Sequence, residues 1–270
     1  MFRLFFRTLR TDWLKFRKSL LPWASIGYPF IAMFLVFLFT IGDKRHPDDA
    51  AFQFAKNILA VGAFFLPFYL VLSITLLGFI ENRSQGWKLM YSQPVGRGYY
   101  YSSKLFFLLT VIVVVFILKF IFASIAIYFI ELYKPQYKVS AFITIWPDFL
   151  VPELKIIGSC FALVSVQYWL SLRVKNFVLP FGIGIFAAIL PLAVFIILGI
   201  AGIISSPEKL NQVLKFDPYS LPFSFVFDLA GIKNNTTIVS IPVKFVIASV
   251  ATGIAIGTAG FFDLRRRNIH

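Results

Sequence analysis

Few residues of this chain are suited to catalysis. The only histidines are His46 and His270, and the only cysteine is Cys160. Hydrolysis within a bilayer would need paired acids, a histidine–glutamate cluster or a serine with a base. The apolar segments defined below contain no acidic residue, and the few Met, His and Cys residues are too scattered for a copper site. We therefore expect no catalytic residue and no metal site, and an intramembrane enzyme is disfavoured.

A loop for binding nucleotide phosphates is also missing. The pattern Gly-x-x-x-x-Gly-Lys-Ser/Thr, whose backbone N–H groups hold phosphates, does not occur in the sequence. If the chain moves anything with ATP, another subunit must bind that ATP. We therefore expect no cofactor on this chain, with ATP and Mg²⁺ bound by a partner ATPase.

Lys119 is the one charged residue placed deep in an apolar segment. It lies 14 residues into the segment 105–130, which is about 21 Å along a helix at 1.5 Å per residue. No acid in any predicted span offers itself as a partner. One interpretation is that the flexible side chain reaches the outer headgroups. The other is a functional cation that lines a transport path, since charges at such depth are costly and often functional.

The composition indicates the elements that carry these residues. Of 270 residues, 59% are apolar and 14% charged, too few charges to surround a soluble core. The apolar residues form blocks of the length that an α-helix needs to cross a bilayer. We predict an all-α membrane protein with a single transmembrane domain (1–270), an interfacial helix at 1–20 and six spans at 22–41, 58–80, 105–130, 156–172, 177–204 and 241–262.

The fourth span is the weakest, with 17 residues and Gln167 inside it. The preceding stretch 141–150 is apolar too, and we expect it to be an outer interfacial or re-entrant piece because it is broken by Pro147, Asp148, Pro152 and Glu153. A seventh span there is the alternative, and it would place the C-terminus outside. A further apolar stretch, Leu221–Ala230, is too short to span.

Basic residues orient the six spans. With both termini on one side, that side holds three acids (Asp12, Glu81 and Asp263) and 15 basic residues: Arg3, Arg7, Arg10, Lys15, Arg17, Lys18, Arg83, Lys88, Arg97, Lys104, Arg173, Lys175, Arg265, Arg266 and Arg267. Lys and Arg mark the cytoplasmic side, so both termini are expected there. Most of the net charge of +14 would then face anionic lipid of the inner leaflet rather than nucleic acid.

The N-terminal segment is predicted to be a basic amphipathic helix. At 100° per residue, its aromatic residues Phe5 and Trp13 share one stripe, and Arg7 and Arg10 lie largely opposite. Such a helix lies along the membrane interface. It either anchors the chain or also touches a cytoplasmic partner.

The connection from Glu81 to Lys104 is the longest cytoplasmic one. Its segment 84–91 is compatible with a short helix, which Pro94 and two glycines then stop. Trp87, Met90 and Tyr91 give this polar loop apolar side chains of kinds enriched at protein interfaces.

A family resemblance rests on these two segments. The sequence Leu-Arg-Thr-Asp-Trp-Leu-Lys-Phe-Arg-Lys-Ser before the first span resembles the start of type-2 ABC exporter permeases. So does the loop pattern Glu81…Trp87-Lys88-Leu89…Pro94-Val95…Arg97…Lys104. The likeness is greatest to six-span permeases of the bacitracin-resistance and lantibiotic-immunity kind. It covers the whole chain in topology and about 35 residues in motif.

The resemblance implies an export function and a set of partners. Two permease subunits, identical or paralogous, would enclose a path for an amphipathic or hydrophobic peptide, drug or lipid, and two ABC ATPase subunits would drive it. The loop would form a coupling helix whose ATPase-facing residues are Glu81, Trp87, Lys88, Tyr91, Pro94 and Arg97. A secondary transporter or a membrane scaffold subunit without an ATPase is the alternative. A secondary transporter usually shows intramembrane acids and an internal repeat, and the sequence shows neither.

Gly253 and Gly257 form a Gly-x-x-x-Gly pair in the sixth predicted span. Small residues at this spacing let two helices approach closely. The pair predicts a packing face, either within the subunit or between two subunits.

Overall fold

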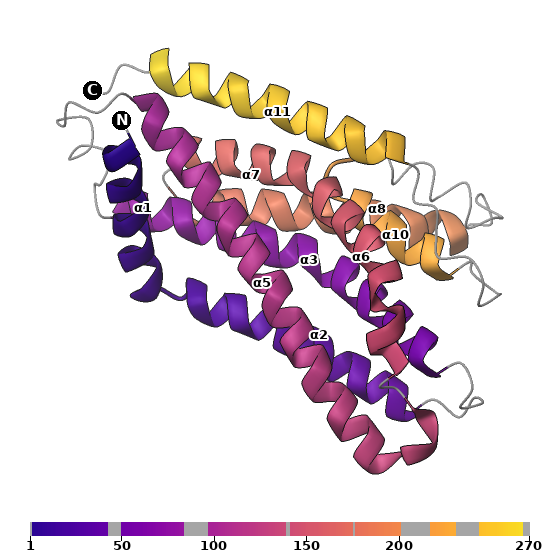
Figure 1. Ribbon diagram of the computed structural model, residues 1–270. Helices are drawn as coiled ribbons and strands as arrows, with labels where there is room; N and C mark the ends of the chain where they lie inside the picture. Colours follow the sequence, from indigo (N-terminus) through magenta and orange to yellow (C-terminus); the bar gives the residue numbers. More distant parts are fainter. Residues whose placement is uncertain are drawn as a thin grey trace.

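The fold is a set of long helices, seen in Figure 1. The computed structural model describes residues 2–42, 50–83, 97–138, 141–174, 176–200, 217–230 and 243–266, and within these ranges it contains no strand. The helices are α1 (Phe2–Arg17), α2 (Leu21–Gly42), α3 (Ala50–Arg83), α5 (Arg97–Tyr133), the short 3₁₀ helix η2 (Pro135–Tyr137), α6 (Phe142–Ser159), α7 (Phe161–Arg173), α8 (Val178–Ile200), α10 (Leu221–Ala230) and α11 (Val243–Arg266).

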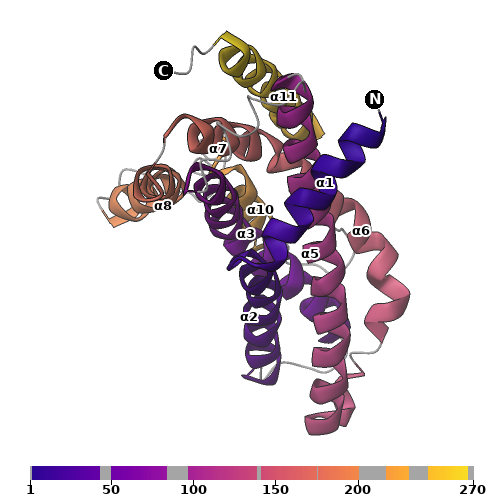
Figure 2. The same ribbon diagram turned by 90° about the vertical axis from the view of Figure 1, so that its left-hand side faces the viewer.

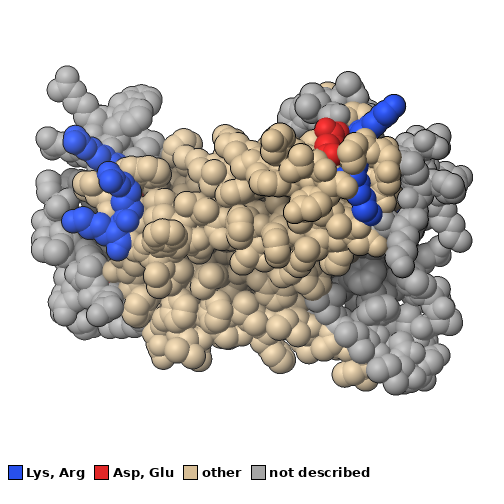
Figure 3. Space-filling view, turned by 90° about the horizontal axis from the view of Figure 1, so that it is seen from below, with Lys and Arg blue, Asp and Glu red and all other residues tan. Residues whose placement is uncertain are grey.

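Five helical segments are long and apolar enough to cross a membrane. In the part of the chain described, they are Leu21–Gly42, Ala50–Glu81, Tyr101–Tyr133, Phe149–Arg173 and Val243–Asp263. Figure 3 shows one face on which the described charged residues lie toward the two ends and the middle is uncharged. The chain is therefore a multi-pass membrane protein. The fifth predicted span coincides with α8, whose described apolar part, Val178–Leu190, is shorter than a full span, so the count of six stays a prediction.

One end of the bundle gathers the beginning of α5 with the ends of α3, α7 and α11. Lys104 of α5 forms an ion pair with Glu81 of α3, and the Tyr101 ring contacts Phe261 of α11 at a centroid distance of 6.2 Å. Arg173 of α7 lies 3.7 Å from Asp263 of α11. Helix α1 lies at the same end (Figure 1). The ends of α2 and α5 meet at the opposite end, where the Lys134 ammonium donates to the carbonyl of residue 41.

The fourth span differs from its prediction. Helix α6 begins at Phe142 and continues through Pro147 and Pro152, so the expected interruption there is wrong. Each proline removes one backbone donor, and a membrane helix tolerates this where neighbouring groups satisfy the freed carbonyl. The break lies instead at Cys160, between α6 and α7. The two helices run in clearly different directions in Figures 1 and 2.

A serine of α11 fills the break. The Ser249 hydroxyl donates to the carbonyl of Ser159 at 2.7 Å and accepts from the backbone N–H of Ala162 at 3.3 Å. Helices bend where a side chain enters their hydrogen-bond ladder in this way. The groups that the bend frees are thus satisfied by α11, which supports the bent form of the fourth span.

Both glycines of the predicted packing pair face α7 of the same chain. A Cβ atom at Gly253 would lie 2.9 Å from the carbonyl oxygen of Phe161. At Gly257 the nearest atom would be the Ser165 hydroxyl, at 3.9 Å. Gly253 therefore permits a backbone approach that any larger residue would obstruct.

Helix α10 has the bounds of the short apolar stretch noted in the sequence. Its Phe223 is fully buried and contacts the Phe64 and Phe68 rings of α3 at centroid distances of 5.5 and 5.7 Å. Just before α10, the Tyr219 hydroxyl donates to the side chain of Gln167 in α7 at 2.9 Å. This short helix thus packs into the bundle.

Candidate coupling site

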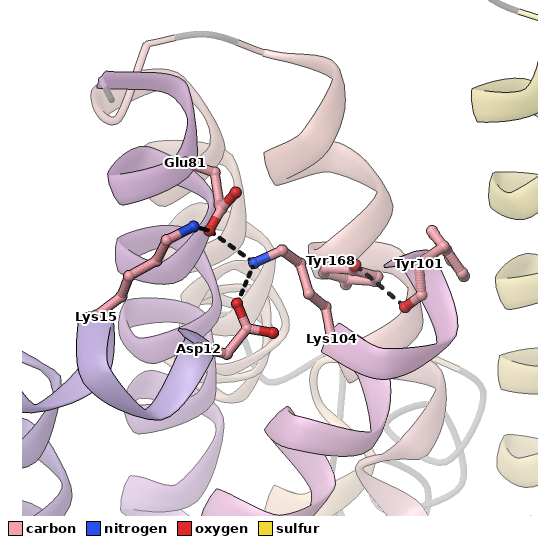
Figure 4. Close-up of polar contacts among 6 residues, drawn as sticks. All are labelled: Asp12, Lys15, Glu81, Tyr101, Lys104 and Tyr168. Atoms are coloured by element: carbon pink, nitrogen blue, oxygen red, sulfur yellow. Dashed lines mark hydrogen bonds and ion pairs between the residues drawn. The ribbon is translucent and has the colours of Figure 1, made fainter. Parts of the chain in front are cut away.

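Four charged residues join α1, α3 and α5 at the end of the bundle where α1 lies (Figure 4). The Lys104 ammonium lies 2.7 Å from Glu81 Oε1 and 3.1 Å from Asp12 Oδ1. Lys15 donates to the same Glu81 oxygen at 2.9 Å. We call Asp12, Lys15, Glu81 and Lys104 the ion cluster. Because Glu81 and Lys104 flank the loop after the second span, their bond ties its two ends together.

Three members of the ion cluster are almost completely buried. Exposure is 0% for Glu81, 1% for Lys104 and 2% for Asp12, whereas the Lys15 side chain is 34% exposed. Burial raises the pKa of Asp12, and the positive charge of Lys104 opposes that rise. Asp12 Oδ2 is buried and makes no hydrogen bond to the described residues. The positive charge of Lys104 is therefore the main group that offsets the cost of burying the carboxylates of Asp12 and Glu81.

Aromatic side chains also join the helices that carry the ion cluster to their neighbours. Phe16 of α1 is buried and meets the Phe107 ring of α5 edge-on at a centroid distance of 5.8 Å. On the other side of α5, the Tyr168 hydroxyl of α7 donates to the Tyr101 carbonyl at 3.4 Å. The beginning of α5 thus contacts α1 and α7 through aromatic side chains, and α3 through the ion cluster.

The structure describes only some of the predicted coupling residues. Glu81 lies inside the ion cluster, with its described partners in α1 and α5. Trp87, Lys88, Tyr91 and Pro94 lie outside the described residues, and Arg97 begins α5 with a side chain that is not described. Because Glu81 is 0% exposed, it does not itself face a partner in this structure. The assignment of the other five residues to an ATPase-facing surface stays a prediction.

The N-terminal segment forms the helix α1. Arg10 is exposed, and Trp13 is 49% exposed while its ring stacks on Phe16 at a centroid distance of 5.4 Å. The side chains of Phe5 and Arg7 lie outside those described. The exposed part of Trp13 leaves an apolar surface for membrane or protein, and which of the two it meets stays a prediction.

Sequence reasoning missed the pairing of Asp12 and Lys104. One signal was available for Asp12. It lies four residues before Phe16 and three after Leu9, which places it on the apolar stripe of α1, since residues three or four apart share a helix face. An acid on the apolar face of a basic helix indicates a buried cation opposite. Nothing in the sequence pattern identifies Lys104, 92 residues away, as that cation.

A second buried ion pair lies within the spans. The Lys119 ammonium donates to Glu153 Oε1, and the two side chains are 2% and 3% exposed. The expectation that Lys119 has no acidic partner is therefore wrong. It failed because the fourth span was predicted to begin at residue 156, whereas the candidate span begins at Phe149 and includes Glu153.

A comparison with known protein families gives one match that covers these residues. A family model described as an ABC-2 family transporter protein matches residues 8–191, about two thirds of the chain. The match includes all four residues of the ion cluster and both members of the Lys119–Glu153 pair. No curated protein sequence matches the chain significantly.

Proposed function

Because the chain belongs to the ABC-2 family of transporter proteins, we propose that it is the permease subunit of an ATP-driven exporter. The family match over residues 8–191 carries this proposal. Membership implies an ABC ATPase partner in general, which fits the missing phosphate loop of this chain. We propose two such ATPase subunits, which bind the ATP and Mg²⁺, and a second permease subunit, identical or paralogous.

The ion cluster supports a route for coupling. In the proposal, ATP-driven closure of the ATPases moves the loop that contains Trp87. Glu81 and Lys104 bracket this loop and bond to each other at 2.7 Å, so displacement of the loop acts on α3 and α5 together. Asp12 and Lys15 transmit the same displacement to α1. Glu81 thus orients the coupling loop from inside the protein.

The proposed cargo is amphipathic or hydrophobic: a peptide, a drug or a lipid. The face seen in Figure 3 is uncharged between its two ends, and many large apolar side chains, such as Phe30, Phe34 and Ile117, are exposed. Such walls suit a cargo that partitions into lipid better than they suit an ion or a sugar.

Both termini are proposed to face the cytoplasm of a bacterial inner membrane, with six spans. Reporter fusions at residue 270 should then behave as cytosolic, and fusions near Asp48 and Asn234 should be exported, because basic residues are retained on the cytoplasmic side. Paired alkaline phosphatase and fluorescent reporters would measure this. An exported reporter at residue 270 would contradict six spans.

The test of coupling is co-purification with the ATPase. We expect Trp87→Ala to weaken the complex by on the order of 2 kcal/mol, as truncating a buried interface anchor can, or roughly 30-fold in affinity. Trp23→Ala is the matched control, since Trp23 is 75% exposed near the beginning of α2 and should leave the complex intact. Pull-down of the tagged chain with the ATPase measures both.

A second substitution at the same site acts differently. We expect Glu81→Lys also to release the ATPase, because a third cation beside Lys15 and Lys104 would displace the loop. Full retention of the ATPase and full transport in both Trp87→Ala and Glu81→Lys would show that the coupling site lies elsewhere.

A further inference from the structure

Four helices converge on the buried Lys119–Glu153 pair. Lys119 comes from α5 and Glu153 from α6. Gly62 of α3 leaves room for the ammonium group, because a Cβ atom there would lie 2.6 Å from Lys119 Nζ. Tyr28 of α2 donates to the Gly62 carbonyl at 3.0 Å, which fixes the wall against which the ammonium lies. The pair is thus enclosed on several sides.

An ion pair in such a place favours two discrete states. With water excluded, the attraction between the charges is strong at contact, and each charge is costly when it is left alone. Partial separation is therefore unfavourable, and the pair is either closed or open with water around both charges. Bistable contacts of this kind convert small forces into discrete movements of helices.

The fourth span is jointed next to this pair. Glu153 lies seven residues before the break at Cys160, so it sits on α6, while α7 follows the break. At the break, the Ser249 hydroxyl accepts a hydrogen bond from one backbone N–H and donates one to a backbone carbonyl. Because this hydroxyl rotates, both hydrogen bonds can follow a change in the angle between α6 and α7, which a continuous helical ladder cannot do.

The two arms of the jointed span are held differently. Helix α7 has polar bonds to three neighbours: Gln167 donates to Thr75 of α3 at 2.9 Å, Tyr168 to the Tyr101 carbonyl of α5, and Trp169 to Asp263 of α11 at 3.2 Å. Helix α6 is joined to α5 by the Lys119–Glu153 pair. At the joint itself, Ser159 accepts the hydrogen bond from Ser249 of α11. Before the joint, α6 meets α3 and α11 through apolar contacts such as Phe149 on Phe52 and Val246 at Gly158. Apolar contacts slide at lower cost than hydrogen bonds break inside a membrane.

We infer that the Lys119–Glu153 pair is a latch that holds α6 against α5, and that α6 swings about Cys160 when the latch opens. The swing separates α6 from α5 on the side of the bundle away from the ion cluster, while α7 stays in place. If the swing of α6 gates a cargo, that role rests on the proposed export function. The swing itself is a property of the fold and does not depend on that function.

Distances between spin labels test the latch on the full chain in nanodiscs. With Cys160 replaced by serine, cysteines at Ile125 of α5 and Val151 of α6, which are 46% and 54% exposed, would carry the labels. The closed latch should give one narrow distance distribution. Lys119→Met should move the main distance outward by about one helical turn, roughly 5 Å, or broaden it by that amount. A distribution in Lys119→Met identical to that of the parent would overturn the latch.

A second label pair serves as the control. Labels at Phe106 of α5 and Arg173 of α7, both exposed, should keep their distance in Lys119→Met, because α7 is held by its own hydrogen bonds. If the distance distributions of both label pairs broaden, the Lys119→Met variant is misfolded. The double variant that exchanges the two charges, Lys119→Glu with Glu153→Lys, is then used in its place. The swap should restore the parental α5–α6 distance. A swapped chain with the control distance intact and the α5–α6 distance still displaced would equally overturn the latch.

Adding the ATPase and ATP separates this inference from the proposed function. A latch linked to export should open or close with nucleotide in the parent complex and stay open in Lys119→Met. If the label distance responds to Lys119→Met and no ATPase binds the chain, the latch stands and the export proposal fails. If the ATPase binds and drives transport while the α5–α6 distance is the same in the parent and in Lys119→Met, the latch fails and the export proposal stands.

Discussion

Replacing Lys104 with methionine should destabilise the protein by about 3–5 kcal/mol, the usual cost of removing one partner from a buried ion pair. The substitution leaves Asp12 and Glu81, both at most 2% exposed, without the cation that they share. Lys15 still reaches Glu81, so the larger loss falls on Asp12. Thermal unfolding of the purified chain in detergent, followed by fluorescence-detected size exclusion, measures the change.

The control and the pH dependence sharpen this prediction. Lys18→Met removes an exposed lysine near the end of α1 and should change the unfolding temperature little. Without Lys104 the pKa of Asp12 rises further, because Lys104 lowers it in the parent. A carboxyl whose folded pKa is raised contributes stability below its unfolded pKa and loses it as pH rises through the folded value. Lys104→Met should therefore regain stability in acid. A variant as stable as Lys18→Met at neutral pH would contradict this account of the ion cluster.

Replacing Glu153 with leucine should have an effect of similar size, about 3–5 kcal/mol, because it leaves the Lys119 ammonium alone among spans. The double variant Lys119→Met with Glu153→Leu should recover most of the loss, since an apolar pair of similar volume has no charge to satisfy. The same thermal assay in detergent measures the single and double variants.

Lys244→Met is the matched control for the lysine half of this double variant. Lys244 is exposed near the beginning of α11, so its replacement should change stability by about 0.5 kcal/mol or less. If the double variant is as unstable as Glu153→Leu alone, then lost packing rather than unpaired charge governs the site.

The spans were predictable from sequence because lipid imposes both a length and a composition on a helix. Helix α2 differs from its predicted range by one residue at each end, and α10 has the bounds of the apolar stretch 221–230. The prediction failed before the fourth span, where Pro147 and Pro152 were expected to break the apolar stretch and separate it from the span. Proline is a strong breaker in water, but the bilayer favours helix so strongly that these prolines lie inside α6.

The ion pairs were not predictable for a different reason. Periodicity says which face of a helix a residue occupies and nothing about which helix lies opposite. Lys104 and Asp12 are 92 residues apart, and Lys119 and Glu153 are 34 apart. Of the candidate site, the sequence thus indicated Glu81 and the unusual depth of Lys119. Their partners follow from the three-dimensional arrangement of α1, α3, α5 and α6.

The hydrogen bonds of Ser249 also constrain the order in which the protein is made. Spans leave the ribosome in sequence order, so α6 and α7 are synthesised before α11, whose serine satisfies the carbonyl of Ser159 and the N–H of Ala162. Until α11 arrives, a bent fourth span would expose two unsatisfied backbone groups to lipid, each costing several kcal/mol. A straight helix avoids that cost, so the nascent fourth span should enter the membrane unbent. Insertion of the last helix then bends it, which makes the joint a late product of biogenesis.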